Sequence, residues 1–177
     1  MIFRDTRLKG VFEVDLERIE DERGFFARSY CKREFNEHSI DLEIAQSSIS
    51  FNRRKGTLRG IHFQAAPLEE KKLVSCVRGA IYDVIIDLRP NSSTYTQWIA
   101  TELSALNDRS VYIPEGCAHG FQTLEDNALV SYHISAFYVP RLARGVRWDD
   151  PAFSVKWPYE PPPVISEKDA SYVDFLK

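Results

Sequence analysis

The chain contains a succession of short runs rich in Val, Ile, Tyr and Phe, and this pattern limits its fold more than any other feature of the sequence. Turn-forming residues bound each run. The runs are residues 10–19, 73–90, 96–104, 110–116 and 128–140. Only two short helices are predicted, at residues 32–39 and 166–176. Many short strands with few helices are typical of an all-β sandwich or barrel.

The clearest alternation of side chains lies in residues 81–88. In a strand, successive side chains point to opposite faces of the sheet. One face of this run is wholly apolar and is predicted to lie in the core, whereas the other carries two carboxylates and is predicted to look into a partly polar cavity. The apolar face comprises Tyr82, Val84, Ile86 and Leu88, and the other face Ile81, Asp83, Ile85 and Asp87.

Length and charge exclude several classes of function. The 177 residues are enough for one domain with its own hydrophobic core. The formal net charge is only −3, from 23 Lys and Arg against 26 Asp and Glu, which argues against binding to nucleic acid or to a charged membrane. Three widely spaced cysteines predict free thiols. A charged N-terminus, and no apolar run approaching about 18 residues, predict a soluble, cytoplasmic protein.

Residues 57–64, Thr-Leu-Arg-Gly-Ile-His-Phe-Gln, place an arginine, an imidazole and an amide on one short strand. In a regular strand His62 and Gln64 would share one face and Arg59 would point to the other. A bend at Gly60 would instead turn Arg59 and His62 to the same side. Of the other histidines, His38 is predicted on a helix surface. His133 would point away from whatever Tyr132 faces, since the two are neighbours on a strand.

Residues 59–64 and 114–121 resemble the two halves of the cupin signature. Metal-binding cupins carry a second histidine in the first half, where this chain has Gln64. A set made of His62, Gln64, Glu69 or Glu70, and His119 would be a poor site for a divalent metal. We therefore expect no metal, which leaves His62 available for acid–base chemistry near neutral pH.

Six segments follow one another in the order and spacing of the dTDP-4-dehydrorhamnose 3,5-epimerases, and the chain resembles that family over nearly its whole length. They are residues 21–26, 58–64, 72–89, 113–124, 145–151 and 165–169. The resemblance implies an all-β, cupin-type jelly-roll barrel with a few short peripheral helices, formed by residues 1–177 as a single domain. It also implies a homodimer that exchanges N-terminal strands, and a C-terminal extension, 157–177, that closes the site.

The implied activity is a cofactor-independent epimerisation that inverts C3 and/or C5 of a nucleotide-linked 4-keto-6-deoxy sugar, in rhamnose-like deoxysugar biosynthesis. Such a reaction needs a base on one face of the sugar, an acid on the other, and charge stabilisation at the keto oxygen. By resemblance the base is His62, the acid Tyr132 and the cation Lys72. Asp169 would orient the base, and the inward-facing Asp83 is an alternative partner.

The resemblance also implies a set of substrate contacts for the diphosphate, the sugar and the nucleobase. These are Arg23, Phe26, Gln46, Arg59, Lys72, His119, Tyr138 and Lys168. Purely structural explanations also exist for several of the site positions. Tyr132 could be an ordinary core tyrosine, and Lys72 a solvated surface charge. Arg59 could form an interior ion pair with Asp83 or Asp87. Ser166 and Asp169 could form a helix capping box, which would take the Asp169 carboxylate away from the base.

Three positions depart from the family pattern. Ser48 stands where asparagine is usual, and Arg28 and Ala143 stand where glutamates are usual. Loss of these polar groups predicts intact acid–base chemistry in an altered ligand pocket, with a different nucleobase, a different 4-keto sugar or a single inverted carbon. The rival functions are a 3,4-ketoisomerase in a similar barrel, a non-catalytic sugar-nucleotide-binding cupin, and a metal-dependent cupin.

Overall fold

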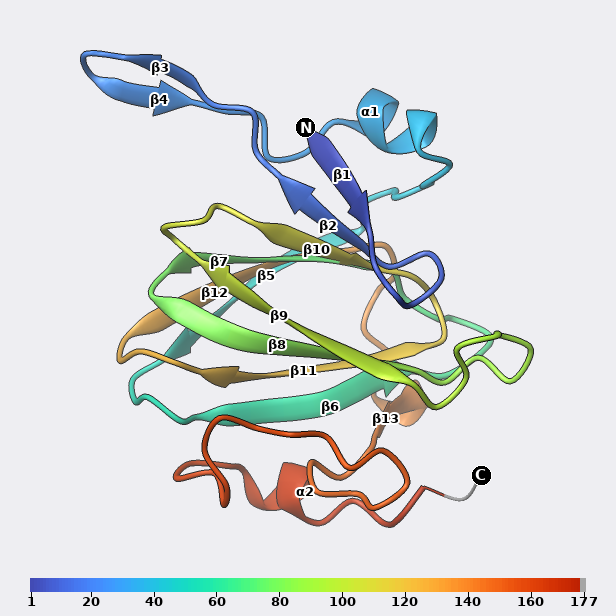
Figure 1. Cartoon of the computed structure of the whole chain (residues 1–177). Coiled ribbons are helices and arrows are strands. Elements are labelled where there is room, and N and C mark those ends of the chain that lie inside the picture. The colour runs from blue at the N-terminus through green and yellow to red at the C-terminus, as the bar shows by residue number, and fades with distance from the viewer. Residues whose placement is uncertain (176–177) are drawn as a thin grey trace.

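The computed structural model describes residues 1–175, which form two antiparallel sheets facing one another across a common core (Figure 1). The six-stranded sheet has the order β1 (Ile2–Asp5), β2 (Phe12–Asp15), β10 (Ser110–Ile113), β7 (Lys72–Arg78), β12 (Ala128–Ile134) and β5 (Gln46–Asn52). The five-stranded sheet has the order β13 (Ala143–Gly145), β6 (Leu58–Gln64), β11 (Cys117–Thr123), β8 (Ala80–Asp87) and β9 (Trp98–Ser104). The predicted all-β barrel is confirmed.

The described residues form far fewer helices than strands, and both α-helices are short. Helix α1 (Lys32–Glu37) forms within the range predicted, and a single 3-10 turn covers Pro140–Leu142. The second predicted helix, 166–176, is wrong in length, because α2 covers only Glu167–Ala170 and residue 176 lies outside the described residues. Neither helix among the described residues is long and apolar enough to cross a membrane.

Contacts from elsewhere in the chain hold the segment that follows α2 in a non-helical path. The Phe175 backbone N–H donates to Asp150 at 2.7 Å, and Arg147 pairs with Asp174 at 2.6 Å. A helix of one turn has little stability of its own. Tertiary contacts therefore decide the conformation of this segment.

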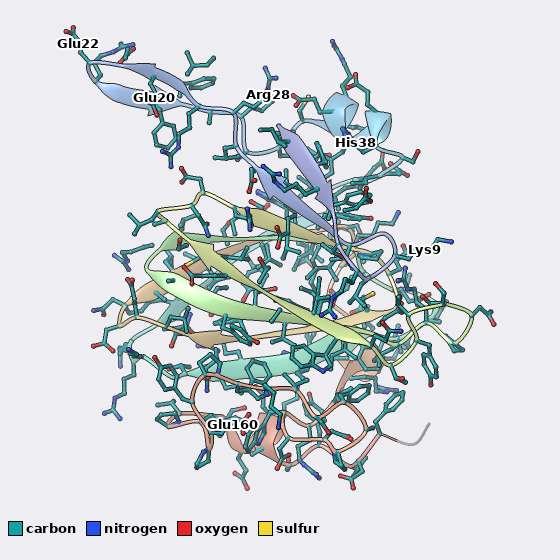
Figure 2. All side chains as sticks on the ribbon, in the orientation of Figure 1. Lys9, Glu20, Glu22, Arg28, His38 and Glu160 are labelled. Atoms are coloured by element: carbon teal, nitrogen blue, oxygen red, sulfur yellow. The ribbon has the colours of Figure 1, made fainter. Side chains whose placement is uncertain are left out.

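Residues 19–26 form a separate hairpin of β3 (Ile19–Asp21) and β4 (Gly24–Phe26), which projects away from the barrel (Figure 1). Figure 2 shows Glu20 and Glu22 on this projecting arm, far from the two sheets. The predicted strand at 10–19 is thus divided between β2 and the start of this hairpin.

Both faces of β8 are buried. Ile81 and Ile85 lie in the core between the sheets, whereas Val84 and Ile86 pack on the outer side of the five-stranded sheet with Trp157 of the C-terminal segment. The C-terminal segment runs along that outer side in Figure 1. The apolar face of residues 81–88 is therefore buried as predicted, but beneath this segment and not inside the barrel. All three cysteines are free, as predicted.

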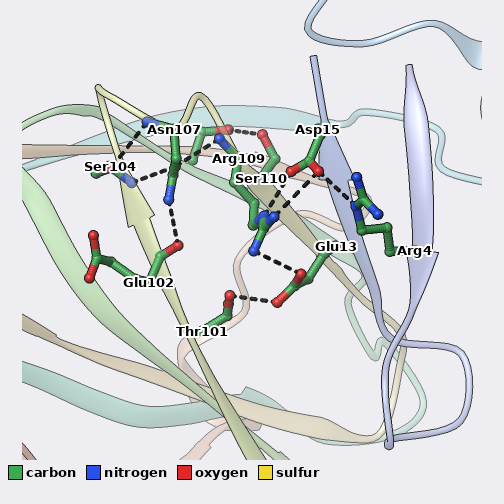
Figure 3. Close-up of polar contacts among 10 residues, drawn as sticks. Arg4, Glu13, Asp15, Thr101, Glu102, Ser104, Asn107, Arg109 and Ser110 are labelled. Atoms are coloured by element: carbon green, nitrogen blue, oxygen red, sulfur yellow. Dashed lines mark hydrogen bonds and ion pairs between the residues drawn. The ribbon is translucent and has the colours of Figure 1, made fainter. Parts of the chain in front are cut away.

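A network of charged side chains connects the edges of the two sheets (Figure 3). Arg109 contacts Asp15 at 2.7 Å and Glu13 at 2.9 Å, and Asp15 also contacts Arg4 at 2.8 Å. Glu13 in turn accepts a hydrogen bond from Thr101 of β9 at 2.6 Å. Strands β1 and β2 of one sheet are thereby joined to β9 of the other.

The carboxylate of Asp87 organises the loop that follows β8. It accepts hydrogen bonds from the backbone and guanidinium of Arg89 and from the hydroxyls of Ser92 and Thr94. Burial opposes ionisation of Asp87, but these donors outweigh it and lower its pKa to about 2. Asp87 thus lies at the end of the strand, outside the cavity that its position in the alternation predicted.

We expect Asp87→Asn to lower the free energy of unfolding at pH 7 by about 2 kcal/mol, because several donors lose a charged acceptor. The native contribution is complete above the ordinary pKa of aspartate and disappears as pH falls through the lowered pKa. Urea unfolding at pH 7 and at pH 3 measures both effects. Asp5→Asn, at an exposed position of β1, is the matched control. Equal stability of the wild type and Asp87→Asn at pH 7 would contradict the expectation.

Candidate active site

A bulge in β6 turns Arg59 and His62 to the same side. Two residues separate them on β6, whereas a single residue separates the positions that pair with them on β11. Both side chains line one cavity. The strand therefore has the bend that a shared ligand would require, and Arg59 does not point away from His62.

Glycines at the bulge allow the two strands to approach closely. Gly60 has a φ of +130°, a backbone conformation that other residues rarely adopt. A Cβ atom at Gly60 would lie 2.5 Å from the Cα of Gly120 on β11. Neither conformation nor space would admit a side chain at Gly60.

His62 is hydrogen-bonded to Asp169 of α2. Its Nε2 donates to one carboxylate oxygen at 2.7 Å, and the other oxygen accepts from the Gly60 backbone N–H at 3.2 Å. Burial of Asp169 opposes its ionisation, but the bonds from His62 and Gly60 outweigh this and lower its pKa. With Nε2 protonated and facing a carboxylate, the Nδ1 of His62 is free to accept a proton.

The N-terminus of α2 supports this arrangement. The Ser166 hydroxyl accepts a hydrogen bond from the Asp169 backbone N–H at 3.1 Å. Only half of the capping box considered from the sequence is formed, because the Asp169 carboxylate turns to His62. The Ser166 half of the cap therefore coexists with the contact to His62, while the Asp169 carboxylate serves the base and not the cap, as the choice between the two required.

A second histidine–aspartate pair lies on the neighbouring strands. His119 of β11 donates from Nε2 to Asp83 of β8 at 2.7 Å, and both side chains are buried. Burial raises the pKa of Asp83, although His119 counteracts it. Asp83 is thus engaged by His119 and not by His62. Arg59 donates to Asn52 at 2.7 Å, so it does not form the interior ion pair with Asp83 that was an alternative.

The six-stranded sheet contributes Tyr132 and Lys72 to the same cavity. Burial, with Asp83 nearby, raises the pKa of Tyr132, so its phenol keeps its proton at neutral pH. Lys72 pairs with Glu70 at 2.8 Å, and both side chains are largely buried. His133 points away from the cavity, as the alternation predicted, and its ring bonds to Ser47 at 2.9 Å.

These groups surround a cavity of about 390 Å³ between the two sheets. Most of the predicted site residues line it: Arg59, His62, Lys72, His119, Tyr132, Tyr138, Lys168 and Asp169. Three others do not. Arg23 and Phe26 lie on the projecting hairpin, and Gln46 uses its amide oxygen to accept the Tyr138 backbone N–H at 2.6 Å.

The cavity also includes side chains to which the sequence gave no part in the epimerisation: Arg144, Tyr172 and Glu70, the last considered only as a metal ligand. Glu70 stands two residues before Lys72, a spacing typical of side chains on one face of a strand. That spacing could have identified it. Nothing in the sequence marks Tyr172, because its position depends on the non-helical path after α2.

The three departures from the family pattern lie in different places. Ser48 and Ala143 line the cavity, whereas Arg28 lies near the projecting hairpin and pairs with Glu34 at 2.9 Å. Gln64 stands at the position of the second cupin histidine, and its side-chain amide forms hydrogen bonds with backbone groups. Its amide oxygen accepts from Val139 at 2.8 Å, and its amide nitrogen donates to the carbonyls of two loops.

The fold and the site define the class of protein as a cupin-type barrel whose cavity is lined by histidine–aspartate pairs, a tyrosine and a lysine. The family model described as dTDP-4-dehydrorhamnose 3,5-epimerase matches residues 5–177. The chain belongs to the dTDP-4-dehydrorhamnose 3,5-epimerase family, and so to the isomerases.

Individual relatives agree over almost the whole chain. A dTDP-4-dehydrorhamnose 3,5-epimerase of Sinorhizobium fredii is 38% identical over 171 residues, covering 97% of this chain and 88% of the relative. A dTDP-4-dehydrorhamnose 3-epimerase of Streptomyces niveus is 39% identical over 170 residues, covering 96% and 81%. The crystal structure of the Bacillus anthracis 3,5-epimerase with TDP and PPi bound has a TM-score of 0.95 at 35% identity, covering 98% of this chain and 99% of that chain.

Proposed function

We propose that this cavity epimerises a 4-keto-6-deoxy sugar carried on dTDP. The Nδ1 of His62 removes a proton from a carbon next to the ketone, C3 or C5. The electrons of the broken C–H bond move to the keto oxygen as an enolate, which Lys72 stabilises. Tyr132 then donates its phenolic proton to the opposite face of the same carbon, and the enolate returns to the ketone with inverted configuration. Exchange with solvent restores the protonation of His62 and Tyr132.

The observation that carries this proposal is that the two acid–base groups come from opposite sheets. His62 is on the five-stranded sheet and Tyr132 is on the six-stranded sheet, and both line the cavity between them. A sugar ring held in that cavity would have one group on each face, which is what inversion at carbon needs. The lowered pKa of Asp169 supports a proton on Nε2 of His62.

Cations in the cavity are suited to a diphosphate. Arg59 and Lys168 would supply donors for phosphate oxygens, because guanidinium and ammonium groups bind phosphate through charge-assisted hydrogen bonds. Tyr138 is 60% exposed and would present its ring to the nucleobase. The bound TDP of the Bacillus anthracis relative supports thymidine as the nucleoside.

The test is deuterium uptake from heavy water into dTDP-4-keto-6-deoxyglucose, followed by NMR at C3 and C5. Enzyme-catalysed uptake at both carbons, with a 4-keto-rhamnose product, is expected. Faster uptake into the CDP-, GDP- or UDP-linked sugar would overturn the assignment of dTDP. A product with the ketone at C3 would instead indicate the rival 3,4-ketoisomerase, and binding without any uptake would indicate the non-catalytic alternative.

A single inversion at C3 is a second candidate within the same family. Ser48 and Ala143 line the cavity, and the short side chains there would give the sugar fewer polar contacts. The Streptomyces niveus relative is itself a 3-epimerase. Deuterium at C3 alone, with C5 unlabelled at long times, would support this candidate over double inversion.

We also propose that this single domain functions in the cytoplasm as a homodimer that exchanges its N-terminal arm. The β3–β4 hairpin leaves Ile19 and Phe26 about 70% exposed, on an arm that extends away from the cavity of its own chain. Phe26 and Arg23, expected to contact substrate, would reach the cavity of a second subunit. The C-terminal extension, which carries Asp169, would close the site from the other side.

We expect Phe26→Ala to raise KM for the nucleotide sugar about tenfold and to change kcat by less than about twofold, because it removes an aromatic contact remote from the reacting carbons. Steady-state kinetics measure both values. Leu106→Ala, which truncates another highly exposed apolar side chain, is the control.

Subunit mixing tests the exchange directly. Unfolding and refolding an equimolar mixture of Phe26→Ala and His62→Asn proteins would create heterodimers with one intact cavity if the arm acts across subunits. Activity should then exceed the mean of the two separate variants when assayed at low substrate. Unchanged activity in a mixture shown by mass spectrometry to contain heterodimers would contradict the exchange.

A further inference from the structure

An aromatic ring from the end of the described chain packs against the side chain of His62. Tyr172 follows α2, and its ring lies edge-to-face with the imidazole, with centroids 6.1 Å apart and an interplanar angle of 71°. It lines the same cavity. Asp169, three residues earlier, bonds to Nε2 of the same histidine. One short segment therefore contacts His62 in two different ways.

Gly145 provides the space that the Tyr172 ring occupies. Strand β13 pairs with β6 so that Gly145 lies directly opposite His62. A Cβ atom at Gly145 would lie 2.2 Å from carbons of the Tyr172 ring, a distance that real Cβ contacts do not show. Gly145 does not share the positive φ of Gly60, so close approach of the ring, and not backbone conformation, requires this glycine.

A single hydrogen bond fixes one atom of an imidazole but leaves the ring free to tilt about it. The side chain of His62 is still 40% exposed, so the surrounding protein does not hold it completely. A tyrosine ring packed at this angle against the imidazole would remove much of the remaining freedom, because edge-to-face pairs have a preferred geometry. Removing that contact would allow Nδ1 to move relative to a bound substrate.

We propose that Tyr172 is a positioning residue that holds the imidazole plane of His62, and that Gly145, which has no side chain, leaves the space for its ring. This inference rests on the proposed function, in which Nδ1 of His62 removes the proton. The role belongs to the ring and not to the phenolic hydroxyl. Tyr172 acts through His62 and is distinct from Tyr132, which faces the cavity from the other sheet.

Three variants test the proposal by two independent measurements. Tyr172→Ala removes the ring, and Tyr172→Phe keeps it. Gly145→Ala leaves residue 172 a tyrosine but pushes its ring away from His62. Val173→Ala is the control, since that neighbouring side chain is 84% exposed. The first measurement is ¹³C relaxation of the His62 ring in substrate-free protein, which reports its motion on fast timescales. The second is kcat and KM for deuterium uptake.

Tyr172→Ala and Gly145→Ala should both increase the motion of the His62 ring and lower kcat about 10- to 100-fold, with KM within about twofold, because small misplacements of a reacting group are costly. Tyr172→Phe and Val173→Ala should match the wild type in both measurements. Unchanged ring motion in Tyr172→Ala would overturn the proposal. An equal loss of kcat in Tyr172→Phe and Tyr172→Ala would also overturn it, because the effect would then belong to the hydroxyl. A rise in KM with unchanged kcat would overturn it too, because the ring would then be a substrate contact.

The two measurements also separate this proposal from the proposed function. If the wild-type protein catalysed no uptake but Tyr172→Ala still mobilised the His62 ring, the positioning contact would stand and the epimerase assignment would fail. If uptake were normal and ring motion did not depend on Tyr172, the epimerase assignment would stand and the positioning role would fail.

Discussion

His62→Asn should lower the rate of deuterium uptake at both C3 and C5 by about 10²- to 10⁴-fold, the range typical of removing a general base. Asparagine is close in size and can still donate to Asp169, so the hydrogen bond that connects β6 to α2 need not be lost. It has no nitrogen that can accept a proton at neutral pH. Binding of dTDP, measured by calorimetry, should change by less than about threefold, because the nucleotide is expected to contact other groups.

The matched control for this prediction is His133→Asn. His133 is also a histidine in a strand next to the cavity, but its ring points away and bonds to Ser47. Uptake in this variant should remain close to the wild-type rate. If His62→Asn exchanged deuterium as fast as His133→Asn, the base would have to be another group, and His119 with its partner Asp83 would be the first candidate.

Tyr132→Phe should separate proton exchange from inversion. With His62 intact, the substrate still loses its proton to the base, and deuterium returns from the same side with retention of configuration. Formation of the epimer should fall about 10²- to 10⁴-fold, because no acid remains on the opposite face. NMR distinguishes the two results, since retained substrate becomes labelled while the epimer does not accumulate.

The chemical state of Tyr132 favours this role over a wide pH range. Burial raises its pKa, so the phenol stays protonated and able to donate well above neutral pH. Tyr30→Phe is the control, because this part-buried tyrosine lies outside the cavity and hydrogen-bonds to the Leu42 carbonyl. A variant Tyr132→Phe that lost uptake and inversion together would show that Tyr132 acts in proton removal, and the assignment of acid and base would need to be reversed.

The sequence was sufficient to predict the class of fold. It was also sufficient to predict which side chains of the regular strands face the cavity. Alternation on β12 was enough to predict that Tyr132 and His133 face opposite sides. Alternation on β8 grouped its residues correctly into two faces, but the face predicted to lie in the core packs on the outer side of the sheet, and Ile81 and Ile85 lie between the sheets. It could not show that both faces are buried, because the C-terminal segment that covers the outer face has no regular periodicity of its own.

Other features of the site depend on contacts between distant segments and could not be read from local patterns. The position of Tyr172 follows from the early end of α2 and from the space at Gly145. The partner of His62 was open between Asp169 and Asp83 until the pairing of β11 with β8 placed His119 diagonally across from Asp83, within hydrogen-bonding distance. The projecting hairpin shares only Ile19 with the run predicted as one strand, and no strand was predicted for its remaining residues.

The bulge in β6 shifts the alternation of side chains by one residue halfway along the strand. Before it, the even-numbered Leu58 packs on the outer side of the sheet and the odd-numbered Arg59 faces the cavity. After it, the odd-numbered Ile61 packs outside and the even-numbered His62 faces the cavity. A regular strand of the same length, without the bulge, would place isoleucine in the cavity and turn the imidazole outside. Deletion of Gly60 would instead restore a regular ladder in which Arg59 and His62 still share the cavity side. The one extra residue at the bulge, and not the regular alternation of the strand, therefore decides which side chain of β6 enters the cavity.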